Sequence, residues 1–360
     1  MKSLADWLVH LEGLHPKGQA GIELGLERIR RVKAALGHTQ HCPVIIVGGT
    51  NGKGSTCAYL ENVIDSAGYR VGCYTSPHLL AYNERVRVNR REASDAALCA
   101  AFSRVEAARQ DAGNVALTYF EFGTLAAWDV FAAAGVEAAI LEVGLGGRLD
   151  AVNAYEPDVS IVTTIALDHA EWLGPDRASI GFEKAGIFRA GKPAFCADAH
   201  PPQTLLDHAA AIGADLRLIG RDFGFQRLPE DRLQWRWWCR SGDRVVRRSL
   251  AYPGLRGAAQ LSNAAVALAA LDALGDSLPV TMQAIRQGLI ATELPGRFQV
   301  IPGKPAIVLD VGHNPQAIAV LADNLSGMGF FDRTHAVVGM LGNKDIRGAL
   351  QPLKDKVDCW

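Results

Sequence analysis

The sequence predicts an α/β protein built around a doubly wound, mostly parallel β-sheet. The first observation is a series of short apolar runs, rich in β-branched residues, which are typical of strands buried on both faces. These runs lie at residues 44–47, 69–74, 136–143, 158–165 and 192–197. The second observation is that helical patterns separate most of these runs. This alternation favours parallel strands joined by right-handed crossovers.

Apolar residues spaced three or four positions apart predict the helices. Ser94 is placed to cap one of them, and Gly37 is placed to end another. The predicted helices are 4–14, 21–37, 53–67, 94–110, 118–134, 179–189, 201–213, 260–274 and 281–291.

Residues 232–251 alternate apolar and basic side chains around Ser241-Gly242-Asp243, which predicts a β-hairpin. Its tryptophans and arginines could indicate stacking on nucleic acid. One hairpin in a neutral protein is more typical of a sheet with a single solvent-exposed face, and we favour that interpretation.

At 360 residues the chain is expected to form two domains, 1–293 and 294–360, with a junction at 294–298. The second domain repeats the α/β pattern, with strands expected at 306–311 and 334–340 and a helix between them that ends at residue 326. A further strand is expected to begin where the sequence stops, so we expect this domain to be truncated at Trp360.

The composition limits the classes of binding partner that can be expected. Lys and Arg number 37 against 38 Asp and Glu, which leaves no net charge to attract nucleic acid or a membrane surface. The seven cysteines form no C-x-x-C pair, which disfavours a zinc knuckle or a disulfide framework. Asp6 and Glu12 interrupt the N-terminal apolar pattern, so no signal peptide is expected. We predict a cytoplasmic protein without membrane or nucleic-acid partners.

The run at 44–47 leads into the glycine-rich segment GGTNGKGS, where Lys53 opens a predicted helix. Glycines let backbone N–H groups converge on an anion, and a helix N-terminus adds partial positive charge. Lys53 could bind terminal phosphates, and Ser55 could offer its hydroxyl to Mg²⁺. The spacing departs from G-x4-G-K-[ST], because Val47 holds the first position and Gly54 separates Lys53 from Ser55. An ordinary strand-to-helix turn is the alternative to phosphate binding.

Ser76, Glu142 and His169 lie at the ends of three of the predicted strands, at the sheet edge that carries the phosphate loop. Together they could hold divalent cations, although Mg²⁺ prefers oxygen and rarely takes imidazole. Singly, each also fits an ordinary structural role. Lys184, beside Glu183, taken alone indicates a surface ion pair of about 0–1 kcal/mol.

Nine segments stand out in order: GTNGKGS, TSPHL, ERVRVN, TYFEF, ILEVGLGGRLDAVN, ALDHAEWLG, EKAGIFR, LPGRF and DVGHNP. In this order they resemble folylpolyglutamate synthase/dihydrofolate synthase, a branch of the Mur ligase superfamily. The likeness extends from Leu4 to Trp360. TYFEF and GIELGLER make the chain most similar to the bifunctional bacterial enzymes. The resemblance implies a P-loop sheet of the Mur ligase central-domain type, with a smaller Rossmann-like second domain.

The resemblance also implies roles for individual residues. ATP would be bound by Thr50, Asn51, Gly52, Lys53, Gly54, Ser55, Asn263, Arg297, Asp310 and His313. Mg²⁺ would be bound by Ser76, Glu142, His169 and Ser55, and Lys184 would be carbamylated. Pterin or folate would lie against Ile22, Glu23, Leu24, Thr118, Leu149 and Asp150. The catalytic residues would be Lys53, Lys184, His169 and Arg297.

The implied reaction is ATP- and Mg²⁺-dependent amide formation between L-glutamate and dihydropteroate or a folate, through an acyl phosphate. We expect a monomer whose domains close about residues 294–298. The alternatives are a cell-wall amino-acid ligase of the same superfamily, a P-loop ATPase or switch, and a nonenzymatic folate-binding fragment.

Overall fold

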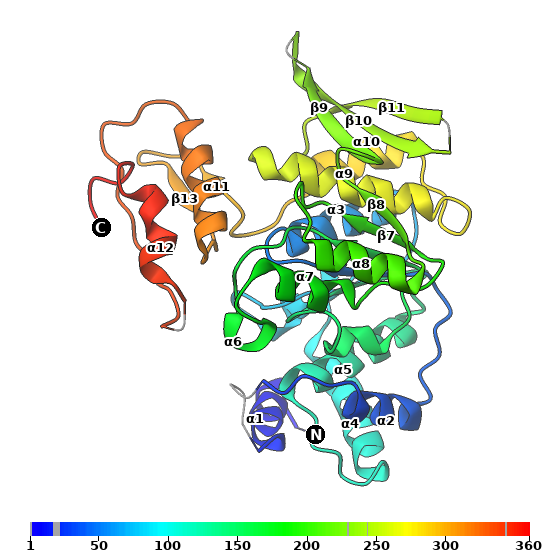
Figure 1. Ribbon diagram of the computed structural model, residues 1–360. Helices are drawn as coiled ribbons and strands as arrows, with labels where there is room; N and C mark the ends of the chain where they lie inside the picture. Colours follow the sequence, from blue (N-terminus) through cyan, green and yellow to red (C-terminus); the bar gives the residue numbers. More distant parts are fainter. Residues whose placement is uncertain (1, 17–21, 229, 243, 343) are drawn as a thin grey trace.

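The structure, a computed structural model, describes residues 2–16, 22–228, 230–242, 244–342 and 344–360. An eight-stranded sheet forms its centre, in the order β4-β3-β2-β5-β1-β6-β7-β8 (Figure 1). The strands are β1 (Val44–Gly48), β2 (Val71–Tyr74), β3 (Val86–Val88), β4 (Arg91–Glu92), β5 (Ala138–Glu142), β6 (Val159–Val162), β7 (Pro193–Cys196) and β8 (Asp215–Leu218). Within this order, the six strands β2, β5, β1, β6, β7 and β8 pair in parallel with their neighbours. Strands β3 and β4 add an antiparallel edge beside β2. The predicted fold class is confirmed.

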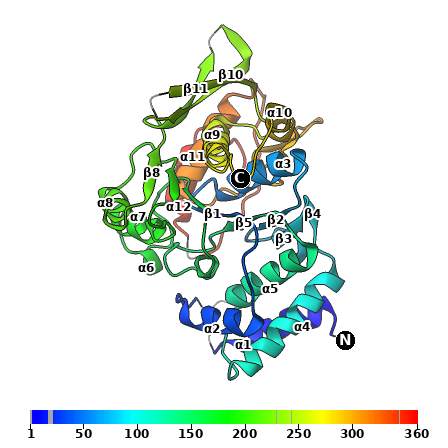
Figure 2. The ribbon, with the colours of Figure 1, turned by 90° about the vertical axis from the view of Figure 1, so that its right-hand side faces the viewer.

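Helices cover both faces of the sheet, which Figure 2 shows nearly edge-on. One face carries α1 (Leu4–Leu14), α2 (Glu27–Leu36), α4 (Asp95–Asp111), α5 (Tyr119–Ala134), α7 (Arg177–Ala185) and α8 (Gln203–Ile212). The other face carries α3 (Lys53–Ser66), α9 (Ala258–Ala273) and α10 (Met282–Ala291). The predicted start of α2 at residue 21 lies outside the described residues.

Two apolar cores therefore lie on opposite sides of the sheet. Side chains of a strand alternate between its faces, so Val44 and Ile46 of β1 join one core while Ile45 and Val47 join the other. All four are fully buried. This explains why β1 is a continuous apolar run rather than an alternating one.

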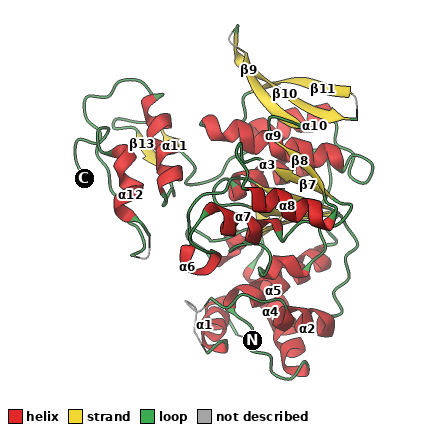
Figure 3. Ribbon diagram, viewed as in Figure 1, coloured by secondary structure: helices red, strands yellow, loops and turns green. Residues whose placement is uncertain are grey.

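A second sheet of three antiparallel strands packs over α9 (Figure 3). It consists of β9 (Phe223–Leu228), β10 (Asp231–Ser241) and β11 (Arg244–Ala251). Trp235 and Trp237 are buried, and the Trp237 indole donates to the carbonyl of Ala265 at 3.1 Å. Arg240 and Arg247 are exposed. The hairpin and its single buried face match the prediction, whereas β9 was not predicted. Asp243, in the predicted turn, lies outside the described residues.

Residues 294–360, here called the C-terminal segment, lie beside the main body in Figure 1. They contain β12 (Gln299–Ile301), β13 (Ile307–Leu309), α11 (Pro315–Ser326) and α12 (Ile346–Leu350). The strand expected at 334–340 is not formed, because only His335 pairs, in an isolated bridge with Cys359. Val337 is fully exposed. An apolar run becomes a strand only where another strand satisfies its backbone. Residues 358–359 do so only for residues 334–336, and no strand pairs with the rest of the run among the described residues.

Short helices complete the described chain, including α6 (Ala170–Leu173). Within the described ranges, no helix combines the length and apolar character needed to cross a bilayer.

Candidate active site

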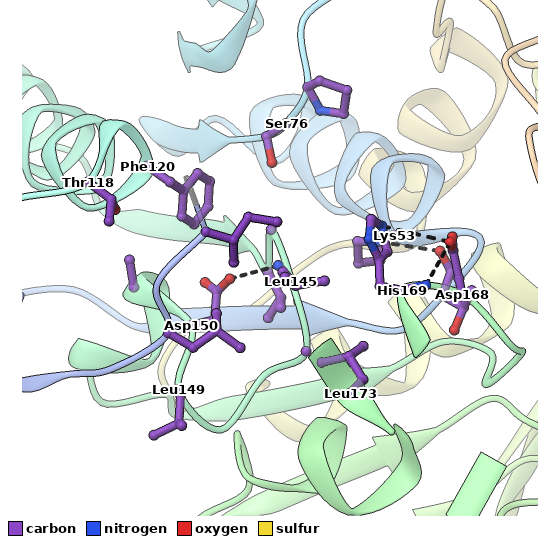
Figure 4. A pocket seen from close by; sticks show the side chains of 18 of the residues that line it. Lys53, Ser76, Thr118, Phe120, Leu145, Leu149, Asp150, Asp168, His169 and Leu173 are labelled. Atoms are coloured by element: carbon purple, nitrogen blue, oxygen red, sulfur yellow. Dashed lines mark hydrogen bonds and ion pairs between the residues drawn. The ribbon is translucent and has the colours of Figure 1, made fainter. Parts of the chain in front are cut away.

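A cavity of about 620 Å³ opens at the C-terminal ends of β1, β2, β5 and β6. Figure 4 shows Lys53, Asp168 and His169 gathered at one end of it, and Thr118, Leu149 and Asp150 toward the other. Twelve of the residues singled out from the sequence line it: Ile22, Glu23, Leu24, Thr50, Lys53, Ser76, Thr118, Leu149, Asp150, His169, Lys184 and His313. Parallel strands bring these residues together because their C-terminal ends share one sheet edge.

The phosphate loop connects β1 to α3 and depends on two glycines with positive φ. Gly49 has φ 134°, and a Cβ there would overlap the hydroxyl of Thr163. Gly52 has φ 94°, and a Cβ there would lie 2.5 Å from the side-chain oxygen of Asn263. The backbone N–H groups of Thr50 and Asn51 are bonded to Thr164. The first N–H groups of α3 are therefore the donors that the loop can offer an anion.

Lys53 folds over this loop and supplies its full positive charge. Its Nζ donates to the carbonyls of Gly49 at 3.1 Å and Thr50 at 3.4 Å. The same charge acts on Glu142, whose pKa is raised by burial and lowered in part by Lys53 and the backbone N–H of Ser76. Lys53 therefore lies where both a phosphate and a carboxylate can interact with it.

Ser76 and Glu142 are directly connected, since the Ser76 backbone N–H donates to Glu142 Oε2 at 3.1 Å. Glu142 is buried, and so is Ser55, whose hydroxyl accepts from Gln260 at 3.4 Å. The described residues contain no group of three His, Cys, Asp or Glu side chains able to hold a metal alone. Mg²⁺ commonly uses one or two carboxylates together with waters and phosphates, so one buried carboxylate with neighbouring hydroxyls fits this cation.

His169 begins α6 with a left-handed φ of 51° and faces a cluster of charged groups. Its Nε2 lies 3.3 Å from Lys344 Nζ and 3.8 Å from Asp168 Oδ1. Burial lowers the pKa of His169 more than the Asp168 carboxylate raises it, so the neutral imidazole is favoured. A neutral imidazole keeps one nitrogen lone pair available.

Lys184 lies on α7 and lines the cavity. It does not form the surface ion pair that the adjacent Glu183 suggested from the sequence. Glu183 instead pairs with Arg148 at 2.7 Å. Burial, with a smaller effect from Lys53, lowers the pKa of Lys184 to about 7. A large fraction of this amine is therefore neutral and nucleophilic near neutral pH.

Asp150 terminates the apolar end of the cavity. Its carboxylate accepts from the backbone of Leu145 at 2.8 Å and Val152 at 3.0 Å. Burial still raises its pKa to about 7. Thr118 caps α5 through a capping box with Glu121, and Phe120 lies beside it in Figure 4. This end can enclose a flat apolar ring and offer it a polar edge.

Of the other residues predicted to bind ATP, Asn263 and Arg297 lie next to the phosphate loop, and neither they nor Asp310 line this cavity. Asn263 faces Gly52, and an Arg297 nitrogen lies 3.4 Å from where a Gly54 Cβ would be. Asp310 accepts from the backbone N–H groups of Phe298 at 2.9 Å and Gly312 at 2.7 Å, and so fixes the junction. Asn51 bonds across to Asn314 of the C-terminal segment.

The residues of this site that the sequence analysis missed include a charged pair. Asp168 and Lys344 both line the cavity and form an ion pair of 2.7 Å. Asp168 could have been found because it precedes His169 directly at a strand end. Lys344 could not, since it follows the region where a strand was wrongly expected.

Comparison with known proteins agrees with this geometry. A family model described as the Mur ligase, glutamate ligase domain matches residues 296–360. The dihydrofolate synthase/folylpolyglutamate synthase of Escherichia coli is 47% identical over 358 residues, which are 99% of this chain and 81% of that protein. The protein of the same name from Haemophilus influenzae is 39% identical, covering 99% and 82%.

Solved structures are similar over the same extent. E. coli FolC in complex with DHPP and ADP has a TM-score of 0.91 and 46% identity, covering 99% of this chain and 82% of that one. A bifunctional folylpolyglutamate synthase/dihydrofolate synthase with Mn, AMPPNP and L-glutamate bound has a TM-score of 0.88 and 46% identity, with the same coverage.

Proposed function

Because this chain belongs to the dihydrofolate synthase/folylpolyglutamate synthase family of Mur ligases, we propose that it is an ATP-dependent ligase that joins L-glutamate to dihydropteroate and to folates. One observation carries the proposal. A single cavity connects the phosphate loop and Lys53 to an apolar compartment that ends at Asp150. A nucleotide and a pterin acid bound in it would meet near Ser76 and Lys184.

The proposed reaction has two steps. A carboxylate oxygen of the pterin acid attacks the γ-phosphorus of ATP, which gives an acyl phosphate and releases ADP. The amine of glutamate then attacks the acyl carbon, the C–N bond forms, and inorganic phosphate leaves. Lys53 and Arg297 would neutralise charge on the transferring phosphoryl group, which is the main requirement of such a step.

A divalent cation fits the donors around Ser76, as relatives with Mn bound also suggest. Ser76, Glu142 and Ser55 would hold it, with His169 as a nitrogen donor. When bound, Mg²⁺ supplies positive charge at the phosphate oxygens. The buried carboxylate of Glu142 supports this role, because burying a negative charge next to a cation offsets its desolvation.

Lys184 is proposed to be carbamylated. Its neutral amine would add to CO₂, forming an N–C bond and releasing a proton, and the product is an anion beside Lys53. The pKa of about 7 supports this step, since a protonated lysine cannot react. Incubation with ¹³CO₂ should give a carbamate ¹³C signal that is absent from Lys184→Arg.

Glutamate addition requires the acyl phosphate to be protected from water. We propose that the domains 1–293 and 294–360 close about residues 294–298 around the bound substrates, as a cytoplasmic monomer. Small-angle scattering with and without ATP and folate tests closure, and identical profiles would reject it.

A coupled assay of ADP release tests the main proposal. ADP should appear only when ATP, Mg²⁺ and a pterin acid are all present, and amide product only when glutamate is added. ADP release without any acid would indicate an ATPase or switch. Pterin binding without ADP release would indicate a nonenzymatic binding protein. Activity with a cell-wall precursor instead of pteroate would indicate the other branch of the superfamily.

A further inference from the structure

The C-terminal segment meets the main body at Asp168. Lys344 donates to Asp168 Oδ1 at 2.7 Å, and His313 Nε2 lies 3.5 Å from Oδ2. Asn314 approaches the same Oδ2 at 3.5 Å. Among the described residues, every recorded ion pair between the C-terminal segment and the rest of the chain ends on this carboxylate.

This contact is well shielded from solvent, since the Asp168 and Lys344 side chains are only 11% and 10% exposed. The apolar cluster of the C-terminal segment, around Ile318, Ala322 and Leu353, is separate from both main cores. Polar contacts are prominent where the segment meets the main body. Asn51 Nδ2 donates to Asn314 at 3.2 Å and to Gln316 at 2.6 Å, and the shielded charged pair lies beside them, where water competes with it poorly.

Lys344 also determines the state of His169. An ammonium group can only donate hydrogen bonds, so the nitrogen 3.3 Å from it, Nε2 of His169, must be an acceptor. The proton of the neutral ring is then on Nδ1. Asp168 accepts the backbone N–H of His169 at 3.0 Å, which fixes the left-handed start of α6. Both members of the pair therefore act on the same imidazole.

We propose that Asp168 and Lys344 are positioning residues of the ligase site: together they fix the C-terminal segment against the end of β6 and hold the His169 ring with its Nε2 turned toward Lys344 as a hydrogen-bond acceptor. This inference rests on the proposed function only for its catalytic consequence. The structural part applies to the free protein.

Hydrogen exchange of the free chain tests the structural part. In Lys344→Met, amides at 168–173 and 340–342 should exchange at least tenfold faster, and Lys344→Arg should recover part of this protection. Lys354→Met is the matched control, because Lys354 is an exposed lysine of the same segment that does not line the cavity. It should leave both segments unchanged. Proton-detected nitrogen shifts of His169 should change from the Nδ1–H form to a mixture of tautomers in Lys344→Met.

Kinetics test the catalytic part. Lys344→Met and Asp168→Asn should each raise KM for ATP about tenfold or more and lower kcat. The double variant should be much less impaired than the product of the two single effects, since both act through one contact. Unchanged exchange at both segments, an unchanged His169 tautomer, or fully multiplicative single effects would each overturn the inference. If the wild-type chain released no ADP at all, the proposed function would fail, while the exchange result would still decide the positioning role.

Discussion

Replacement of the buried Lys184 should make the protein more stable while abolishing ligase activity. The folded-state pKa of this amine is about 7, against an ordinary value of 10.5, because burial opposes its charge. The unfolded chain therefore binds this proton more tightly than the folded chain does. The resulting destabilisation is fully present below pH 7 and disappears as the pH rises toward 10.5.

The magnitude follows from about 1.4 kcal/mol per pH unit. A group with these two pKa values reduces the free energy of unfolding by roughly 5 kcal/mol at pH 6 and by roughly 2 kcal/mol at pH 9. Methionine occupies a similar volume and carries no proton. Lys184→Met should therefore gain several kcal/mol at pH 6, and this gain should shrink by about 3 kcal/mol at pH 9.

Urea unfolding at both pH values measures the difference directly. The buffers must be free of CO₂, because a carbamate would change the charge of Lys184. Lys354→Met, an exposed lysine, serves as the control and should change stability by less than about 0.5 kcal/mol. A Lys184→Met gain that does not depend on pH, or a loss of stability at pH 6, would refute the reasoning.

Three further predictions concern the phosphate loop, the second sheet and the loop after β2. Gly49→Ala should cost about 1–3 kcal/mol and weaken ATP binding, since φ 134° and contact with Thr163 leave no room for a methyl group. The control Gly13→Ala, inside α1 with open space around it, should be neutral or stabilising; equal thermal shifts for both variants would contradict this. Trp237→Ala should cost about 3–5 kcal/mol in urea unfolding, because its buried ring would lose its packing and its hydrogen bond to Ala265 of α9. Glu84→Gln should raise exchange of the Leu79 amide at least tenfold. Leu79 donates to Oε2 at 2.7 Å while Leu80 and Ala81 both donate to Oε1, and an amide offers a single oxygen; unchanged protection at Leu79 would show that other contacts hold this loop.

The central sheet could be predicted because its signal is local. Strands β1, β2, β5 and β6 are short runs of buried residues, whereas β8 at the sheet edge is only partly buried and was not predicted. The placement of Lys53, Ser76 and His169 around one cavity then follows from topology alone, since all three come after strands of the same parallel sheet.

The features that escaped prediction depend on contacts distant in sequence. Strand β9 has no strong alternation of its own and is defined by its pairing with β10. Residues 334–340 have the composition of a strand but no partner beyond the His335 bridge. The pair between Asp168 and Lys344 joins residues separated by 176 positions, and no spacing pattern indicates it. Burial of Lys184 likewise depends on how α7 packs against the rest of the chain. In the sequence, the adjacent Glu183 suggested an exposed lysine instead.

The two cores on opposite sides of the sheet divide the cavity between them. Residues on the α5 side form the compartment around Thr118 and Asp150, whereas the phosphate loop leads into α3 on the other side. Mutations that reshape one compartment therefore repack a different set of helices from those that reshape the other. Mutations in the helices of one side can therefore change which acid substrate is selected without altering the residues that bind the nucleotide.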